Sequence, residues 1–329
     1  MLWESNACST WVVGWDALPL VEAADDRPLI ERRAVLRGGF YEMQARSVIE
    51  RVPVWAGVSE GWGVSPYRGC AHACVGCGAR SGHGRLGLDA GRDFETRVVV
   101  RPNVVVRLRA ELARWGGEPV AVGVSGDVYQ VAERTYRLMP GVVAALAEAG
   151  VPFTVYTKSP LVLRDAGVLA EAGASVAVSI AFVDERIRRG VEPGAVGAQA
   201  RLELVSALVE AGVACRVRMG PVLPLLSDAA DQLGATVRRI AAAGAVAVEP
   251  VVLRLPPGTR EWYLEWLGGA HPELVGRYEE LYDRSGLPSA GYEERIVGQI
   301  GQLCRAYGLA CGAGVAERRE PRFGQLALV

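Results

Sequence analysis

The stretch Cys70-Ala-His-Ala-Cys74-Val-Gly-Cys77 decides the fold, because it places three of the chain's seven cysteines within eight positions. Soft thiolate ligands select zinc, copper(I) or iron–sulfur clusters. The spacing CxxxCxxC lets one loop wrap a cubane cluster while supplying three of its four iron ligands, so that one iron keeps an open position. An open position on a metal is typical of a reactive site rather than a structural one.

Three other interpretations of these cysteines compete with a cluster. A structural zinc site would recruit His72 or His83 as a fourth ligand, a disulfide would join two cysteines, or all three would be buried apolar side chains. Zinc motifs usually pair two such halves a dozen or more residues apart, and no second half stands near this one. Disulfide frameworks belong mainly to short secreted chains. The pattern therefore favours a cluster.

At these residues the chain resembles the radical SAM superfamily, whose CxxxCxxC motif carries a [4Fe-4S] cluster that binds S-adenosyl-L-methionine (SAM) at its open iron. It is more closely similar to the spore-photoproduct-lyase-like branch, particularly its actinobacterial members. The likeness runs from about residue 40 to about residue 270. The matching segments, in chain order, are SPYRGC (65–70), LDAGRDF (88–94), GDVYQ (126–130) and YTK (156–158).

The resemblance implies an enzyme that cleaves SAM reductively at a [4Fe-4S] cluster ligated by Cys70, Cys74 and Cys77. Cleavage would release a 5′-deoxyadenosyl radical that abstracts hydrogen from the substrate, and the electron would come from a reductase such as a flavodoxin or ferredoxin. The residues that match SAM-binding positions of the family are Lys158, Ser179, Asp127, Ser125 and Gly76.

Lys158 is the only lysine among 36 basic residues, the others being arginine. A lysine presents a compact ammonium where arginine presents a rigid fork, so the two are not interchangeable in a tight site that meets one carboxylate. In the family, the matching lysine contacts the carboxylate of the methionine part of SAM. The competing interpretation of Lys158 is an exposed lysine at a helix start. For Asp127, the interpretation that competes with SAM binding is a turn or N-cap carboxylate.

Short apolar runs alternate with helical patterns along the chain, which indicates βαβ units and an α/β fold. In such folds the C-terminal ends of the strands meet at one mouth, where the cysteine loop, Ser125–Asp127, Lys158 and Ser179 would become neighbours. The resemblance implies a partial (β/α)6 TIM-type barrel of the radical SAM type. The predicted strands are 62–66, 120–124, 153–157, 175–182, 214–220 and 245–252, and the predicted helices 103–115, 134–149, 161–172, 198–211 and 229–243.

Three segments are expected. Residues 1–58 form an irregular N-terminal extension that packs on the barrel, residues 59–255 the radical SAM core, and residues 256–329 a C-terminal helical appendage. No apolar run reaches the roughly 18 residues of a membrane span. We therefore expect no membrane partner. A cluster whose thiolates must stay reduced predicts a cytoplasmic protein. The net charge of −1 gives no global basic footprint for nucleic acid.

The chain departs from the family pattern at several positions. Gly76 and Gly78 stand where relatives carry aromatic residues, and the first of those aromatics packs against the adenine of SAM, so the sequence predicts weaker SAM binding or a more open pocket. Val124 stands near the position where spore photoproduct lyases have a cysteine, so their DNA-repair reaction is not expected here. Arg218 and Glu249 interrupt apolar strands and would either bind a polar substrate or form a structural pair.

These departures favour a small-molecule substrate, in secondary metabolism, whose identity the sequence does not determine. One alternative is a nucleotide- or nucleic-acid-modifying radical SAM enzyme, and another is a non-catalytic iron–sulfur or zinc binding protein. The nucleic-acid alternative would be favoured if a set of arginines formed one exposed stripe. These are Arg80, Arg85, Arg92, Arg97, Arg101, Arg107 and Arg109.

Overall fold

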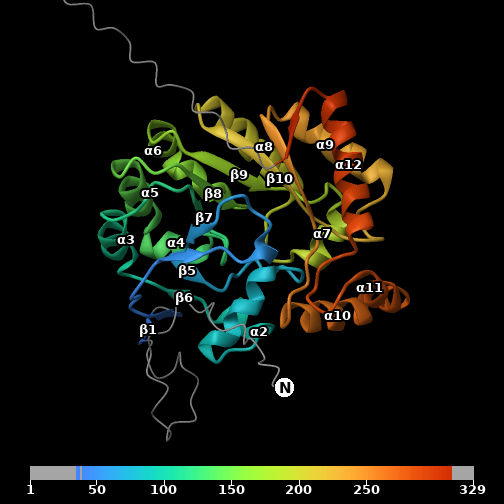
Figure 1. The fold of residues 1–329 in the computed structure, drawn as a ribbon, viewed down its shortest axis with the longest axis horizontal. Helices are drawn as coiled ribbons and strands as arrows, with labels where there is room; N and C mark the ends of the chain where they lie inside the picture. Colours follow the sequence, from blue (N-terminus) through green and yellow to red (C-terminus); the bar gives the residue numbers. More distant parts are fainter. Residues whose placement is uncertain (1–34, 38, 313–329) are drawn as a thin grey trace, which may run out of the picture.

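The computed structural model describes residues 35–37 and 39–312 (Figure 1). Its main sheet has eight strands, of which the central six run parallel in chain order, as the sequence predicts. The six are β4 (Trp62–Val64), β7 (Val120–Val122), β8 (Phe153–Thr157), β9 (Ser175–Ser179), β10 (Ala214–Val222) and β11 (Ala247–Val252).

The two edges of this sheet are formed by short strands. β3 (Ile49–Arg51) pairs antiparallel with β4, and β12 (Ala310–Cys311) pairs parallel with β11. Within the described part of the chain these two edge strands do not pair with each other, so the sheet is an open, partial barrel. The predicted α/β class and its six βα units are confirmed.

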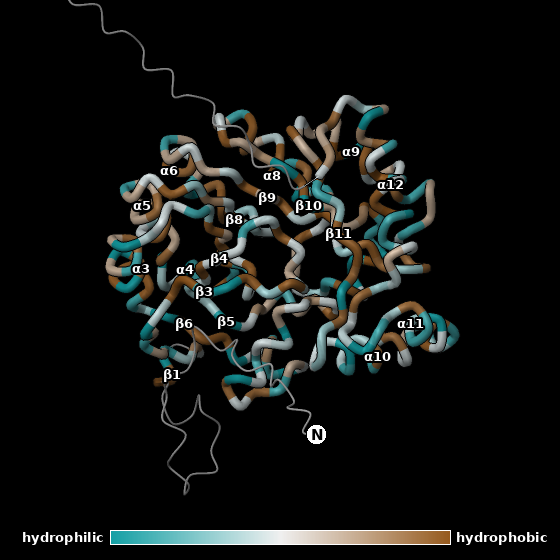
Figure 2. The backbone as a smooth tube through the Cα atoms, viewed as in Figure 1, coloured by the Kyte–Doolittle hydropathy of each residue, from teal (hydrophilic) through white to brown (hydrophobic). Residues whose placement is uncertain are grey.

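Helices surround the sheet, and the core lies between the two layers (Figure 1). Apolar segments follow β8 to β10, where Val155, Val178 and Val217 are fully buried (Figure 2). Each buried valine contributes about 1.5–3 kcal/mol of hydrophobic free energy. The helices are α2 (Arg92–Thr96), α3 (Val104–Leu112), α4 (Val131–Tyr136), α5 (Met139–Glu148), α6 (Ala166–Glu171), α7 (Glu185–Val191), α8 (Ala198–Glu210), α9 (Ala230–Ala242), α10 (Thr259–Ala270), α11 (Val275–Leu281) and α12 (Ala290–Ala306), with 3₁₀ turns η1 (Val54–Ala56), η2 (Gly78–Leu86), η3 (Pro160–Asp165) and η4 (Pro272–Leu274).

The prediction of one helix over residues 134–149 is wrong, because the chain forms α4 and α5 there. Arg137 has a left-handed backbone conformation with φ +48°, which ends α4. The buried carboxylate of Glu133 then accepts hydrogen bonds from the backbone N–H of Leu138 at 2.9 Å and of Met139 at 3.2 Å. These bonds satisfy two of the open donors at the start of α5, where Pro140 needs none.

The described part of the N-terminal extension is more regular than the sequence predicts. It holds β1 (Val35–Arg37), β2 (Phe40–Glu42), β3 and η1. β1 and β2 join β6 (Val99–Val100) and β5 (Tyr67–Arg68) in a second, four-stranded sheet. Residues 1–34 lie outside the described part of the chain.

The described part of the C-terminal segment is mainly helical: α10 and α11 form a pair, and α12 packs beside α9 (Figure 1). Among the helices described, none combines the length and the apolar character that crossing a membrane requires. The turn before α12 passes very close to the end of β11. Gly286, at φ +81°, accepts a hydrogen bond from the backbone N–H of Leu255 at 2.8 Å.

A side chain at this turn should destabilise the protein. A Cβ on Gly286 would lie 1.7 Å from the carbonyl oxygen of Leu255. Gly286→Ala should therefore lower the free energy of unfolding by about 2–5 kcal/mol, through left-handed backbone strain and overpacking. Urea denaturation of the cluster-free protein measures the change.

The matched control is Gly298→Ala, because Gly298 lies in α12 with no atom within 4 Å of an added Cβ. That substitution should raise the free energy of unfolding by about 0.5–1 kcal/mol. A Gly286→Ala protein as stable as the control would contradict the close contact between this turn and β11.

Candidate active site

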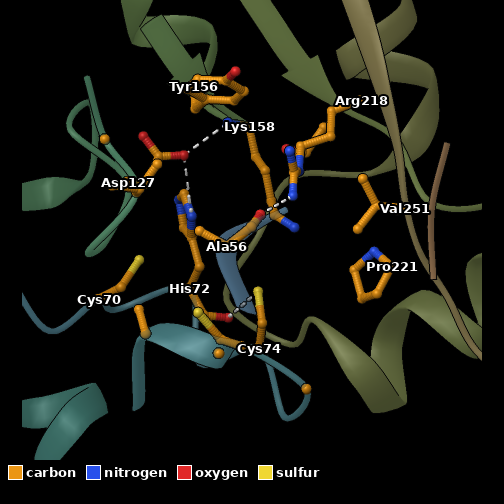
Figure 3. A pocket seen from close by; sticks show the side chains of 18 of the residues that line it. Ala56, Cys70, His72, Cys74, Asp127, Tyr156, Lys158, Arg218, Pro221 and Val251 are labelled. Carbon is orange, nitrogen blue, oxygen red and sulfur yellow. Dashed lines mark hydrogen bonds and ion pairs between the residues drawn. The ribbon is translucent and has the colours of Figure 1, made fainter. Parts of the chain in front are cut away.

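A cavity lies at the C-terminal ends of the parallel strands, where the sequence predicts the site (Figure 3). The cysteine loop reaches it after β5, and neighbouring strands deliver side chains to its walls. Seven of the eight predicted site residues line it together: Cys70, Cys74, Cys77, Gly76, Asp127, Lys158 and Ser179.

Ser125 is the exception, because it does not line this cavity. Its backbone N–H donates to Oγ of Ser65 at 3.3 Å, and the residue lines a second, adjoining pocket. Ser179, at the last position of β9, lines the main cavity and is half-buried. The two serines predicted to hold SAM are therefore divided between two pockets.

Arg80 holds the cysteine loop in its conformation. Its side chain is fully buried, and Nε donates to the carbonyl oxygen of Cys74 at 2.9 Å. Nη1 donates to the carbonyl oxygens of Ala90 and Gly91, and Nη2 pairs with Glu95. Because this guanidinium has partners on three segments, it fixes the loop against the chain that follows it. From the sequence, Arg80 was predicted only as one member of a possible exposed stripe of arginines.

The same loop is held from the barrel side by Gln130 and by the connection between α7 and α8. Nε2 of Gln130 donates to the carbonyl oxygen of Gly69 at 2.8 Å, and Oε1 accepts from the backbone N–H of Ala71 at 3.2 Å. The backbone N–H of Gly194 donates to the carbonyl oxygen of His72 at 3.0 Å. A Cβ on Gly194 would lie 2.3 Å from the Ala71 oxygen, so only glycine fits there.

The three cysteines of the loop are free thiols that face the cavity. Burial raises the pKa of Cys70 and raises that of Cys74 to about 12, so a metal must displace their protons on binding. Among the described residues, no three His, Cys, Asp or Glu side chains are close enough together to ligate one ion. Three thiols on one short loop are a donor set that fits an iron–sulfur cluster.

The two histidines considered as zinc ligands have other neighbours. Nδ1 of His72 lies 3.5 Å from Oδ2 of Asp127 (Figure 3). His83 is buried and its ring packs edge-on against the ring of Phe94, with centroids 5.3 Å apart. Both rings are therefore engaged with other side chains in this structure.

Asp127 connects the ends of β7 and β8. Its Oδ1 accepts from the backbone N–H of Tyr129 at 2.8 Å and from the hydroxyl of Thr157 at 2.7 Å. Its Oδ2 accepts from the backbone N–H of Lys158 at 2.7 Å. The turn carboxylate considered from the sequence is therefore present, and it also orients the lysine that follows β8.

Lys158 points into the cavity and forms an ion pair with the buried carboxylate of Glu192. Its Nζ lies 2.6 Å from Oε1 of Glu192, whose Oε2 lies 2.5 Å from Arg201. Burial disfavours both charges, but the pairing outweighs it: the pKa of Lys158 is raised, and that of Glu192 is lowered to about 2. Glu192 belongs to no sequence motif, whereas Arg201 was detectable as a charge within the apolar pattern of helix 198–211.

The space beside the two glycines of the loop is filled from elsewhere in the chain. A Cβ on Gly76 would lie 2.8 Å from Cδ1 of Leu253 and 3.6 Å from the ring of Tyr263. A Cβ on Gly78 would lie 2.5 Å from Cε3 of Trp55, which itself lines the cavity. The more open pocket that the glycines suggested is not formed, and η1 supplies an aromatic wall.

Arg218 holds η1 in this position. Its Nη1 lies 2.7 Å from Oε1 of Glu249 and donates to the carbonyl oxygen of Gly57 at 3.0 Å, while Nη2 donates to that of Ala56. Burial lowers the pKa of Arg218 and raises that of Glu249. The arginine thus faces the mouth of the barrel, but its donors bind Glu249 and the segment that carries Trp55.

Comparison with known proteins identifies the family. The model of the radical SAM superfamily matches residues 64–230, about half of the chain. An uncharacterized protein of Mycobacterium tuberculosis (strain H37Rv), Rv2578c, is 44% identical over 277 residues, which are 82% of this chain and 82% of that protein. An uncharacterized protein of Acidianus two-tailed virus, ORF301, is 28% identical over 54% of this chain and 60% of its own length.

The fold is similar to that of spore photoproduct lyase. A variant of that enzyme solved with bound AdoMet and dinucleoside spore photoproduct gives a TM-score of 0.66 at 10% identity, covering 84% of this chain and 82% of that one. The chain belongs to the radical SAM superfamily and is a radical SAM enzyme. The family prediction made from the sequence is confirmed.

Removing the charge of Glu192 should destabilise the protein. Glu192→Gln leaves the half-buried Lys158 and the buried Arg201 without their shared carboxylate. Breaking such a buried pair should cost about 3–5 kcal/mol of unfolding free energy, measured by anaerobic urea denaturation.

The matched control is Glu148→Gln, which removes the carboxylate of an exposed pair with Arg109. That change should cost about 0–1 kcal/mol. If both substitutions have equally small effects, the carboxylate of Glu192 does not stabilise the protein by pairing with Lys158 and Arg201.

Proposed function

We propose that this enzyme binds a [4Fe-4S] cluster through Cys70, Cys74 and Cys77 and uses it with SAM to modify a small molecule. The observation that carries the proposal is the meeting of the three thiols with Lys158 at one cavity. When bound, the cluster and SAM supply a 5′-deoxyadenosyl radical that takes hydrogen from the substrate. A flavodoxin or ferredoxin supplies the electron.

In this proposal Lys158 binds the carboxylate of SAM. Its ammonium has three donors, of which Glu192 takes one, so another can serve a ligand carboxylate in the cavity. Asp127 orients this lysine through its backbone N–H, and Ser179 adds a polar group on the same wall. Gly76 and Gly78 provide no aromatic surface for the adenine of SAM. Trp55 provides that surface instead.

The substrate is proposed to be a small molecule rather than a nucleic acid, because the arginines of the candidate stripe do not form one exposed surface. Arg80 and Arg101 are buried. Arg97 pairs with Asp93, and Arg109 with Glu148. A stripe for phosphate backbones needs its cations on one accessible face.

The cysteine loop is tested by release of 5′-deoxyadenosine. Anaerobically reconstituted, reduced protein given SAM should release it, and the Cys70/Cys74/Cys77→Ala protein should release none, because it has lost all cluster ligands from the loop. Cys311→Ala is the matched control, since Cys311 is exposed and lies outside the cavity, and it should behave as wild type. Equal release by the triple variant would contradict the proposal.

Lys158 is tested by SAM affinity. A charge-assisted hydrogen bond contributes about 1.5–3 kcal/mol, so Lys158→Met should weaken SAM binding by roughly 10- to 150-fold. Equilibrium dialysis with labelled SAM and cluster-loaded protein gives the dissociation constant. Lys158→Arg keeps the charge but changes its shape, so its affinity for SAM should lie between those of wild type and Lys158→Met. Unchanged SAM affinity in Lys158→Met would remove this lysine from the binding site.

A further inference from the structure

Two cysteines at the C-terminal end of the described chain have no place in the proposed reaction. Cys304 lies in the last turn of α12 and is fully buried, whereas Cys311 lies in β12 and is exposed. Both are free thiols, and neither lines the reaction cavity. An exposed thiol meets a soluble oxidant, while a buried thiol is shielded from it. The pair therefore combines one accessible sulfur with one protected sulfur.

The end of α12 turns the chain back, so that Cys311 returns to the helix. Gly308 has a left-handed backbone conformation with φ +69°, which glycine adopts without steric cost. Its backbone N–H donates to the carbonyl oxygen of Arg305 at 3.3 Å, and that of Leu309 donates to the carbonyl oxygen of Cys304 at 2.9 Å. These two bonds form a Schellman motif, which ends the helix. β12 then pairs with β11 and packs against α12.

The sulfur of Cys311 lies over the face of α12 that carries Cys304. A Cβ on Gly301 would lie 3.9 Å from Sγ of Cys311, so this sulfur is close to the helix about one turn before Cys304. Helical side chains lean toward the N-terminus of their helix, so Cys304 covers that same area. The side chain of Cys311 also hydrogen-bonds that of Cys304, whose pKa is raised to about 12 by burial and by this neighbour. Gly301 has no side chain to keep the two sulfurs apart.

We infer that Cys304 and Cys311 are a redox-active pair that forms a reversible disulfide between α12 and β12. The oxidant is a low-molecular-weight disulfide such as oxidised glutathione. The thiolate of Cys311 attacks one oxidant sulfur, which forms a mixed disulfide and releases the other sulfur as a thiolate that takes up the proton lost by Cys311. The thiol of Cys304 then loses its proton and attacks Sγ of Cys311, which releases the second oxidant thiol. Two cysteine thiols are oxidised by two electrons, and one oxidant disulfide is reduced to two thiols.

The disulfide fastens the edge of the main sheet at a position connected to the reaction cavity. In β12, Cys311 pairs with Val248 of β11. The next residue of β11 is Glu249, which holds Arg218 and through it the segment that carries Trp55. Disulfides of cytosolic proteins are usually transient, and exposed ones are the labile, regulatory kind. The pair is thus a reversible fastening and not a permanent structural bond.

Locating the disulfides of the full chain tests the pair. Cluster-free wild-type protein is equilibrated anaerobically with oxidised or reduced glutathione, alkylated, digested with trypsin and analysed by mass spectrometry without reduction. Trypsin cleaves after Arg295, Arg305 and Arg318, so the two cysteines fall in separate peptides, 296–305 and 306–318. Oxidised glutathione should yield these peptides linked, and reduced glutathione should return them unlinked. The outcome depends on neither the cluster nor SAM.

Variants separate the roles of the two thiols. In Cys304→Ala, oxidised glutathione should leave Cys311 as a mixed disulfide with glutathione, because the second thiol is missing. In Cys311→Ala, Cys304 should stay a free thiol, because burial shields it from the oxidant. The matched control is Cys215→Ala, which removes a fully buried thiol of β10 and should give the linked peptides as wild type does. Circular dichroism checks that each variant is folded.

Wild-type protein that gives no linked peptides in oxidised glutathione would overturn the inference. So would linked peptides that reduced glutathione does not separate, or glutathione found on Cys304 and not on Cys311. Because the fold holds the two sulfurs side by side, folded protein should give more of the linked peptides than protein unfolded in urea at the same oxidant concentration. An equal yield from the two would show that the fold does not form the pair, and would also overturn the inference.

Discussion

Buried charge at the mouth of the barrel must be compensated within the chain, and this constraint organises the site. Lys158 is held by Glu192, which also pairs with Arg201, and Arg218 is held by Glu249. These pairs cost desolvation, and removing one partner would leave a buried charge alone. The protein thereby keeps cationic donors beside the cysteine loop in a setting where water is scarce and electrostatic interactions are strong.

The same arrangement explains how the chain replaces the aromatic residues missing from its cysteine loop. Gly76 and Gly78 leave space that Leu253 and Trp55 fill, and Trp55 stays in place because Arg218 binds the backbone carbonyl groups of the η1 segment. Loss of aromatic residues in one loop is thus compensated by a residue some twenty positions earlier in the sequence. The wall so formed separates the reaction cavity from the second pocket, which Ser125 lines.

The sequence predicted most of the fold because its signals are local. Buried strands such as 153–157 are short apolar runs, and the cysteine spacing needs no tertiary information. What it missed depends on contacts between distant segments. Glu192 carries no motif and gains its role only when β8 and the end of α7 meet. The break between α4 and α5 depends on the capping carboxylate of Glu133. Side-chain packing across the cavity, as at Trp55, has no signature in a single sequence.

In the proposed function, the three thiols of one loop hold a cluster with an iron left open for SAM. The most direct measurement is the electron paramagnetic resonance spectrum of the reduced, reconstituted protein before and after addition of SAM. If SAM binds the open iron, the spectrum of a reduced [4Fe-4S] cluster should appear and its g-values should change when SAM is added. A cluster spectrum that SAM leaves unchanged at saturating concentration, or iron-free protein with one tightly bound zinc, would contradict the account.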